Sequence, residues 1–202
     1  MAATASAYGL RPVKRMDGLP YSGAVSHYAI DPAGEGTNIY KGSIVILDSE
    51  GFIAISTATG ADETSNNLGG NSIGALGVFM GCSYTNAFGV QHSGYYPSGQ
   101  NFESTPIVAY VIDDPFVLFQ AQLDGTGLQT IIGSNTFLPI VQSTTTGSTR
   151  TGNSDTALDA SVTQTTEAFK IVAHVSDPGD AFVDVLVKFN QAYHLHTTNV
   201  GV

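Results

Sequence analysis

The sequence predicts a mainly β fold, a small β-barrel or sandwich built from hairpins, with an extended N-terminal arm. Short segments rich in Val, Ile, Phe and Tyr alternate with turn residues, as in all-β proteins. Of the 202 residues 23 are glycines, and only 12% are charged, about half of the usual share. No convincing stretch combines helical spacing of apolar residues with the length of a helix. We expect one β-rich domain at residues 24–202, preceded by an arm at residues 1–23.

The arm lacks hydrophobic periodicity and ends in a turn-rich segment, residues 18–23. Such an arm is extended and can become ordered on a partner. Arg11, Lys14 and Arg15 lie within five residues of each other. With Asp17 they give residues 1–20 a net charge of +2, which leaves −12 for the other 182 residues of a chain whose total is −10. This basic segment is the main electrostatic anomaly of the sequence.

The first strands are expected between residues 24 and 56. Residues 24–30 predict a strand that ends at the breaker run 31–36. The turn sequence Asp-Ser-Glu-Gly lies between the apolar segments 43–47 and 52–56. This pattern predicts a hairpin, with Gly51 at the turn position that accepts a positive φ.

Two apolar segments follow in the middle of the chain. Residues 75–84 contain repeated glycines and predict a bent or bulged strand rather than a helix. Residues 106–112 and 116–122 flank Asp-Asp-Pro at 113–115, which predicts a second hairpin built from core strands.

The C-terminal part combines an irregular and a regular segment. Residues 143–166 are rich in Thr and predict a long exposed loop, irregular edge strands or a contact surface. Residues 169–175 and 183–189 alternate between apolar and other side chains with a period of two, and they flank turn residues 176–180. This pattern predicts a hairpin.

Residues that could carry chemistry have simpler structural interpretations. Asp113 and Asp114 are adjacent, so on a strand they would point to opposite faces, and with Pro115 they fit a turn. His194 and His196 could supply two metal ligands from one strand face, but two ligands make no site, and a solvated C-terminal strand or tail is expected. Cys82 is expected to pack as a small hydrophobe because it lies in an apolar run, and its separation of ten residues from His92 is no evidence for or against a contact.

Several function classes are disfavoured. Gly-x-Ser-x-Gly is absent, and the glycine-rich residues 69–74 lack the Lys of a phosphate-binding loop, so no enzyme, catalytic residue, metal or cofactor is predicted. One cysteine allows no intrachain disulfide. Seven basic residues against seventeen acidic ones argue against a nucleic-acid partner. Neither a membrane span nor, at residues 1–10, a secretory signal is indicated.

An ordered series of segments resembles a family of tailed-phage virion proteins encoded near the major capsid protein. The segments are Ala7-Tyr8-Gly9-Leu10-Arg11-Pro12-Val13, Tyr21-Ser22-Gly23-Ala24 with Tyr28, Ile39-Tyr40-Lys41-Gly42-Ser43-Ile44-Val45, Ile73-Gly74-Ala75-Leu76-Gly77-Val78 and Tyr110-Val111-Ile112-Asp113-Asp114-Pro115. Together the resemblance covers residues 7–119. It implies a decoration (cement) protein on the capsid exterior, made in the host bacterial cytoplasm. Such proteins bind the major capsid protein, often as homotrimers at three-fold and quasi-three-fold positions, and stabilise the assembled head.

For such a protein, Arg11, Lys14 and Arg15 are expected to pair with acidic capsid surface; the alternative is a solvated arm whose charges aid solubility. A second hypothesis is a β-rich receptor-binding or carbohydrate-binding module of the virion, with Tyr95, Tyr96 and Phe102 stacking on sugars. A third and weaker hypothesis is an esterase or peptidase, which the absence of a nucleophile motif opposes.

Overall fold

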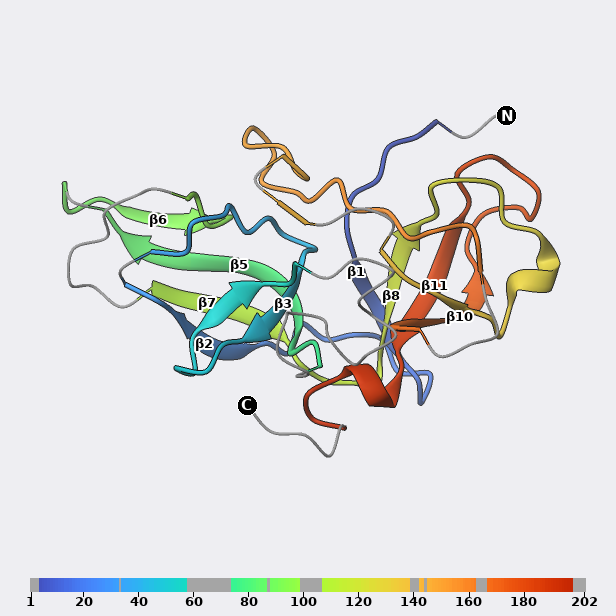
Figure 1. Cartoon of the computed structure of the whole chain (residues 1–202), viewed down its shortest axis with the longest axis horizontal. Helices are drawn as coiled ribbons and strands as arrows, with labels where there is room; N and C mark the ends of the chain where they lie inside the picture. Colours follow the sequence, from blue (N-terminus) through green and yellow to red (C-terminus); the bar gives the residue numbers. More distant parts are fainter. Residues whose placement is uncertain are drawn as a thin grey trace.

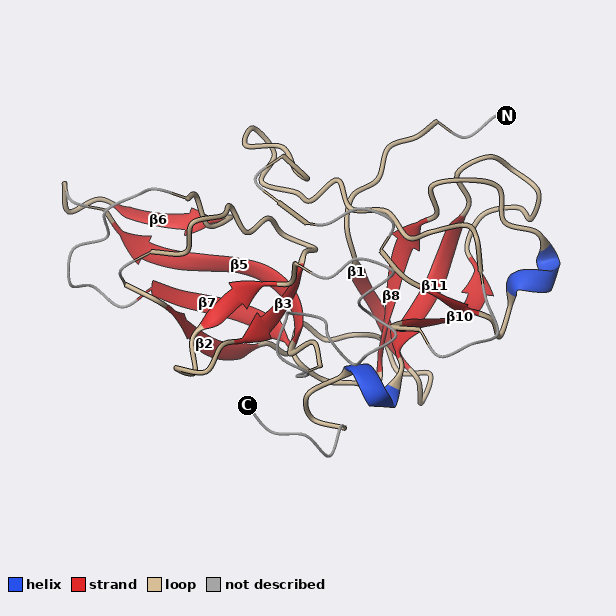
Figure 2. Ribbon diagram, viewed as in Figure 1, coloured by secondary structure: helices blue, strands red, loops and turns tan. Residues whose placement is uncertain are grey.

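The fold is mainly β, as predicted, and consists of two antiparallel sheets that lie side by side (Figures 1 and 2). The computed structural model describes residues 4–32, 34–57, 74–86, 88–98, 107–138, 142–143, 145–162 and 167–197. Within these residues the only helical segments are two short 3-10 turns, η2 (Gln129–Ile131) and η3 (Gln191–Tyr193).

The six-stranded sheet is built from one continuous part of the chain. Its strands are β2 (Ser26–Ile30), β3 (Ile44–Leu47), β4 (Ile53–Ile55), β5 (Gly77–Thr85), β6 (Gln91–Gly94) and β7 (Ile107–Ile112). The order is β2-β7-β5-β3-β4, with β6 paired to β5. The predicted first strand and the β3–β4 hairpin are confirmed, and Gly51 in the hairpin turn has a φ of +83°.

Strand β5 is bulged, as its glycines predicted. Its register against β7 shifts between Phe79 and Gly81, and Gly81 has a φ of +134°, a conformation that L side chains rarely adopt. At the start of the strand, a Cβ on Gly77 would lie 2.0 Å from the carbonyl oxygen of Ile112. The two backbones therefore approach to a distance that only glycine permits.

The five-stranded sheet combines both ends of the chain. Its strands are β1 (Arg11–Arg15), β8 (Val117–Gln122), β9 (Asn135–Thr136), β10 (Phe169–His174) and β11 (Asp184–Phe189), in the order β1-β8-β11-β10-β9. The predicted β10–β11 hairpin is confirmed. The predicted arm is extended at β1, but it pairs with β8 and is not separate from the folded body. The buried Leu10 side chain fixes this end of the arm in the core.

The second predicted hairpin is wrong, although both of its strands exist. Strand β7 pairs with β2 and β5 in one sheet, while β8 pairs with β1 and β11 in the other. Both strands are central and largely buried on both faces, so each needs two neighbours and packing layers of its own. Residues 113–116 consequently carry the chain from one sheet to the other.

Two hydrophobic cores hold the body together. One lies inside the six-stranded sheet and includes Phe79 and Cys82; this sheet curls so that its outer strands β2 and β4 come into contact. The other covers the five-stranded sheet, where Phe119, Phe169 and Phe189 pack on one another. Ile44, Val78 and Ile112 of the six-stranded sheet also belong to this second core. We call it the shared core, because it joins the two sheets.

The Thr-rich segment is irregular but not a fully exposed loop. Its described residues form isolated bridges with residues next to both sheets: Asn153 pairs with Lys41, before β3, and Leu158 pairs with Leu123, after β8. Ser154 and Leu158 are fully buried. The described residues of this segment contain no edge strand, and the segment is a loop that is exposed at some positions and buried at others, where its apolar and hydroxyl side chains pack against the body.

Candidate docking surface on the basic edge strand

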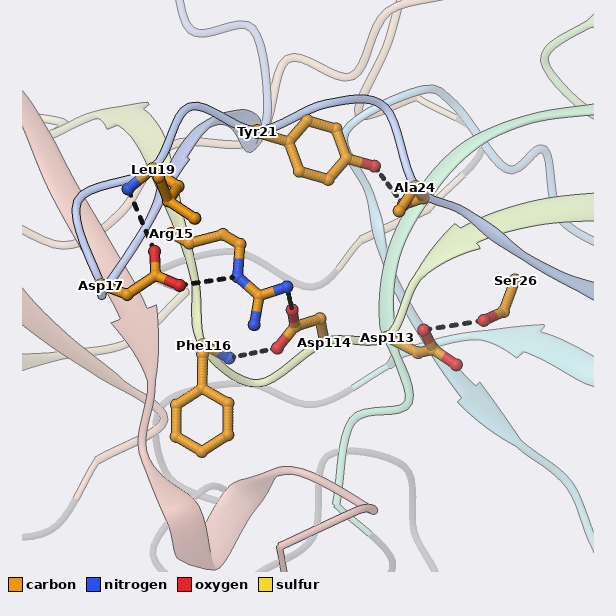
Figure 3. A network of polar contacts seen from close by, with 9 residues as sticks. All are labelled: Arg15, Asp17, Leu19, Tyr21, Ala24, Ser26, Asp113, Asp114 and Phe116. Carbon is orange, nitrogen blue, oxygen red and sulfur yellow. Dashed lines mark hydrogen bonds and ion pairs between the residues drawn. The ribbon is translucent and has the colours of Figure 1, made fainter.

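The basic edge strand β1 lies where the chain crosses between the two sheets. Residues 16–25 lead from β1 into the six-stranded sheet, and residues 113–116 lead back out of it. The two crossings are joined by a backbone hydrogen bond from Met16 N to Phe116 O at 2.8 Å. They are also joined by an ion pair between Arg15 Nη1 and Asp114 Oδ2 at 3.1 Å (Figure 3). Arg15 is thereby tied to the frame of the protein.

Arg15 is held from two sides. Its Nε lies 3.5 Å from Asp17 Oδ2, and the two side chains are 45% and 50% exposed. Asp17 and Asp114 are themselves oriented by backbone N–H groups, those of Leu19 and Phe116 respectively. At this exposure the Arg15–Asp17 pair contributes at most about 1 kcal/mol, so it positions the guanidinium more than it stabilises the fold.

Asp113 points away from Asp114 and ties the outgoing crossing to β2. Its carboxylate accepts hydrogen bonds from Ser26 Oγ at 2.9 Å and from Tyr28 Oη at 2.7 Å, and it lies 3.4 Å from His196 Nε2. Burial raises the pKa of Asp113, but the hydrogen bonds from Tyr28 and Ser26 outweigh burial and lower it. The predicted turn role is confirmed for Asp114, whose Oδ1 accepts from Phe116 N, but not for Asp113, whose carboxylate binds side chains of β2.

The arm before β1 is fastened to the five-stranded sheet. Ser6 N donates to Gln122 Oε1 at 2.8 Å, and Tyr8 Oη donates to Asp184 Oδ1 at 2.9 Å. Burial and the Asp184 carboxylate raise the pKa of Tyr8. The Arg11 guanidinium lies 4.2 Å from the centre of the Tyr8 ring, a cation–π contact. Arg11 is therefore positioned by the arm, like Arg15 by the crossings.

Four exposed apolar residues lie on β1 and on the two crossings next to it. Val13, Met16, Leu19 and Phe116 are between 41% and 60% exposed. Backbone hydrogen bonds connect their segments, from Arg15 N to Leu19 O and from Met16 N to Phe116 O. Lys14 is exposed and forms no ion pair with any described residue. We call this surface the β1 patch; it consists of Val13, Lys14, Arg15, Met16, Leu19 and Phe116.

The β1 patch combines what a docking surface needs. Burial of its apolar side chains against a partner is favourable, and Lys14, which forms no ion pair with a described residue, favours an acidic partner. Sequence reasoning found Lys14 and Arg15 by their charge, but missed Leu19 and Phe116. Their exposure results from the crossing of the chain, which no local pattern reveals.

The predicted solvated tail is wrong for His194. The residue is fully buried because its segment pairs with Ala75, whose N donates to Tyr193 O at 2.7 Å and whose O accepts from Leu195 N at 2.9 Å. Burial and the neighbouring His196 lower the pKa of His194 to about 4. No set of three or more His, Cys, Asp or Glu side chains is arranged for a metal within the described residues.

Cys82 is buried, as predicted, and burial raises its pKa to about 12. His92 stacks on Tyr84 instead, with ring centres 5.2 Å apart. Of the aromatic residues considered for sugar stacking, Tyr96 is fully buried and Tyr95 stacks on Tyr40 at 5.3 Å. Phe102 lies outside the described residues.

Comparison with protein-family models, with curated proteins and with solved structures finds no match for this chain. Among the residues that the structure describes, no helix has the length and apolar character needed to cross a membrane.

Proposed function

We propose that the chain is a structural protein of a tailed-phage head, a decoration or cement protein that binds the outer surface of the assembled capsid and stabilises it. The observation that carries this proposal is the β1 patch. It combines Lys14 and Arg15 of β1, a strand that is fixed to the body, with four exposed apolar side chains on β1 and on the two crossings beside it. All of its residues lie within residues 7–119, the part of the chain that resembles virion proteins encoded near the capsid gene.

The physical mechanism is a mixed apolar and electrostatic contact. Apolar side chains at the centre of an interface exclude water, and Arg and Lys stems pack beside them. Because Arg15 already pairs with Asp17 and Asp114, Lys14 is the cation of the patch that pairs with a carboxylate of the partner. Because β1 is already ordered by β8, little conformational entropy is lost when the patch docks. The partner is the major capsid protein, through an acidic part of its outer surface.

Several copies acting together would make modest contacts sufficient. A homotrimer at three-fold and quasi-three-fold positions presents three equivalent patches, so the second and third contacts form at high effective concentration. Mass photometry of the free protein tests this part of the proposal, with a trimer as the expected species. A monodisperse monomer that also occupies capsids singly would contradict it.

The proposal is tested by adding the purified protein to expanded heads that lack it, followed by cryo-microscopy and a heat-resistance assay. We expect a copy number close to that of the capsid subunit, density on the capsid exterior and higher heat resistance. A few copies at a tail tip would favour the receptor-binding alternative. Heads that are equally stable with and without bound protein would reject the stabilising role.

A further inference from the structure

A pocket of about 320 Å³ lies at the junction of the two sheets, beside β1. Its walls come from four separate parts of the chain: Tyr8, Leu10 and Arg11 from the arm and β1, Lys41 from the segment before β3, Met80 from β5, and Asn153 from the Thr-rich segment. The volume suits one or two side chains of a partner and lies at the small end of the range of ligand sites.

The pocket is built on a close approach of two glycines. Leu10 N donates to Gly42 O at 2.9 Å, and a Cβ on Gly9 would lie 2.7 Å from that same oxygen. Both glycines have a positive φ, +71° for Gly9 and +89° for Gly42. This contact fixes the arm against the six-stranded sheet, so the pocket is part of the fold.

Two cations line the pocket without a carboxylate partner among the described residues. Lys41 is held by its backbone, whose N donates to Gly152 O and whose O accepts from Ser154 N, both at 2.9 Å. Its stem lies over Gly81, where a Cβ would be 3.4 Å from Lys41 Cε. Arg11 stacks on the Tyr8 ring, and no described residue accepts a hydrogen bond from its guanidinium. In a chain of net charge −10, this convergence of unpaired cations is unusual.

We propose that this pocket binds an acidic side chain of a partner protein, with Lys41 and Arg11 pairing with the carboxylate and Leu10 and Met80 contacting apolar groups beside it. Charge-assisted hydrogen bonds from two cations favour a carboxylate. The apolar part of the wall favours a peptide over a bare inorganic anion. A nucleic acid is disfavoured, since the net charge of −10 on the chain repels a polyanion.

The inference rests on the proposed function only for the identity of the partner, which would be the capsid protein. The first experiment therefore uses the full chain without capsids. The chain has three methionines, and Met80 lines the pocket, so methyl-labelled methionine gives a local NMR signal, while the Met16 signal reports any binding at the β1 patch instead. The probes are acetyl-Leu-Glu-amide, acetyl-Leu-Gln-amide and glutarate.

We expect acetyl-Leu-Glu-amide to shift the Met80 signal with a dissociation constant on the order of 1 mM, as for a ligand of this size, and to leave Met16 unchanged. Lys41→Gln and Arg11→Gln are each expected to weaken binding at least about fivefold. Lys188→Gln, on β11 outside the pocket, serves as the matched control and leaves binding unchanged. Equal binding of the Glu and Gln peptides, or of the wild type and Lys41→Gln, would overturn the inference.

Head-binding assays then separate this inference from the proposed function. Peptide binding that depends on Lys41, combined with no binding to heads, would leave the pocket standing and remove the capsid role. If the protein bound heads equally well with Lys41→Gln and no peptide shifted the Met80 signal, the capsid role would stand and the pocket assignment would fall. Glutarate binding as tightly as the peptide would point to a free small carboxylate and overturn the assignment to a protein partner.

Discussion

The two sheets are assembled in different ways. All strands of the six-stranded sheet come from one continuous segment, residues 26–112, and two of its five pairings, β3–β4 and β5–β6, join neighbours in the chain. The five-stranded sheet joins β1 to β8 across about a hundred residues, so the whole six-stranded sheet is inserted between two paired strands. The β1 patch lies where this insertion begins and ends, and the pocket lies between the arm and the inserted sheet. The candidate binding features therefore depend on the long-range pairing of β1 and on the contact between the sheets.

The strongest test of this comparison concerns the shared core. Phe119→Ala removes a fully buried ring that packs on Phe189, and we expect it to lower the free energy of unfolding by about 3–5 kcal/mol. Because the shared core includes residues of both sheets, the six-stranded sheet should open with it. The thiol of Cys82 is buried in the other core, so its reaction with a thiol-specific reagent measures that opening. We expect this reaction to be at least about 100-fold faster in Phe119→Ala than in the wild type.

The control for that experiment is Phe116→Ala. The Phe116 ring is exposed, so its removal should leave the labelling rate of Cys82 nearly unchanged. If Phe119→Ala destabilised the protein while Cys82 remained as protected as in the wild type, the two sheets would unfold independently and the shared core would not couple them.

The second prediction tests whether the N-terminal arm packs against the folded body or extends freely into solvent. Leu10→Ala truncates a buried side chain of the shared core and should cost about 3 kcal/mol, measured by urea denaturation. Val13→Ala, three residues later and exposed, should change stability by less than about 0.5 kcal/mol. Equal, small effects of both substitutions would show that the arm contributes nothing to the fold. Because Leu10 belongs to the core, point substitutions test the arm's role in binding better than deletion of residues 1–20.

The third prediction concerns pH at the contact between η3 and the six-stranded sheet. The folded-state pKa of His194 is about 4, below its value near 6.5 in the unfolded chain. The unfolded state therefore binds more protons between these values. We expect the protein to lose up to about 3 kcal/mol as the pH falls from about 6.5 to 4, and to keep this stability above pH 6.5.

Urea denaturation at a series of pH values measures this loss, and NMR titration of the His194 ring measures the pKa directly. His194→Phe, which replaces the ring by an apolar one against Phe189, should flatten the dependence on pH, while exposed His27→Gln should leave it in place. A His194 ring that titrates near 6.5 would contradict the buried placement.

The fourth prediction concerns the crossing at Asp113. Asp113→Asn keeps the shape but weakens the hydrogen bonds from Ser26 and Tyr28, and should cost about 1–2 kcal/mol at pH 7. The lowered pKa of Asp113 means that its contribution is present above about pH 4 and is lost as the pH falls further. Wild type and variant should therefore converge in stability in acid. Exposed Asp17→Asn is the control, and a constant difference down to pH 2 would contradict the account.

Much of the fold was predictable because it is local. The β3–β4 and β10–β11 hairpins have alternating side chains and short turns, and the bulge in β5 follows from its glycines. The β7–β8 pairing was mispredicted because apolar strands on either side of Asp-Asp-Pro look the same whether they pair with each other or enter different sheets. The burial of His194 was missed for a related reason, since its partner Ala75 lies far away in the sequence.

The candidate site was predictable only in part. The charges of Arg11, Lys14 and Arg15 are visible in the sequence, but their division of roles is not. Arg15 pairs with Asp114, Arg11 stacks on Tyr8 at the pocket, and Lys14 remains exposed. The Arg15–Asp114 pair depends on the long-range pairing of β1 with β8, whereas Arg11 stacks on a residue three positions before it.

The last prediction tests the β1 patch as the docking surface, with a variant that we expect to change stability least. A variant of the β1 patch, Lys14→Glu with Leu19→Ser, changes two exposed side chains and should shift stability by no more than about 1 kcal/mol in total. Lys170→Glu with Leu128→Ser makes the same changes away from β1, near η2 and β10.

The deciding measurement is co-sedimentation of wild type and both variants with expanded heads that lack the protein, at a fixed salt concentration. The account predicts at least about tenfold weaker binding of the β1 patch variant, with the Lys170→Glu, Leu128→Ser variant binding like the wild type. Wild-type binding by a folded β1 patch variant would contradict the assignment of the β1 patch as the docking surface.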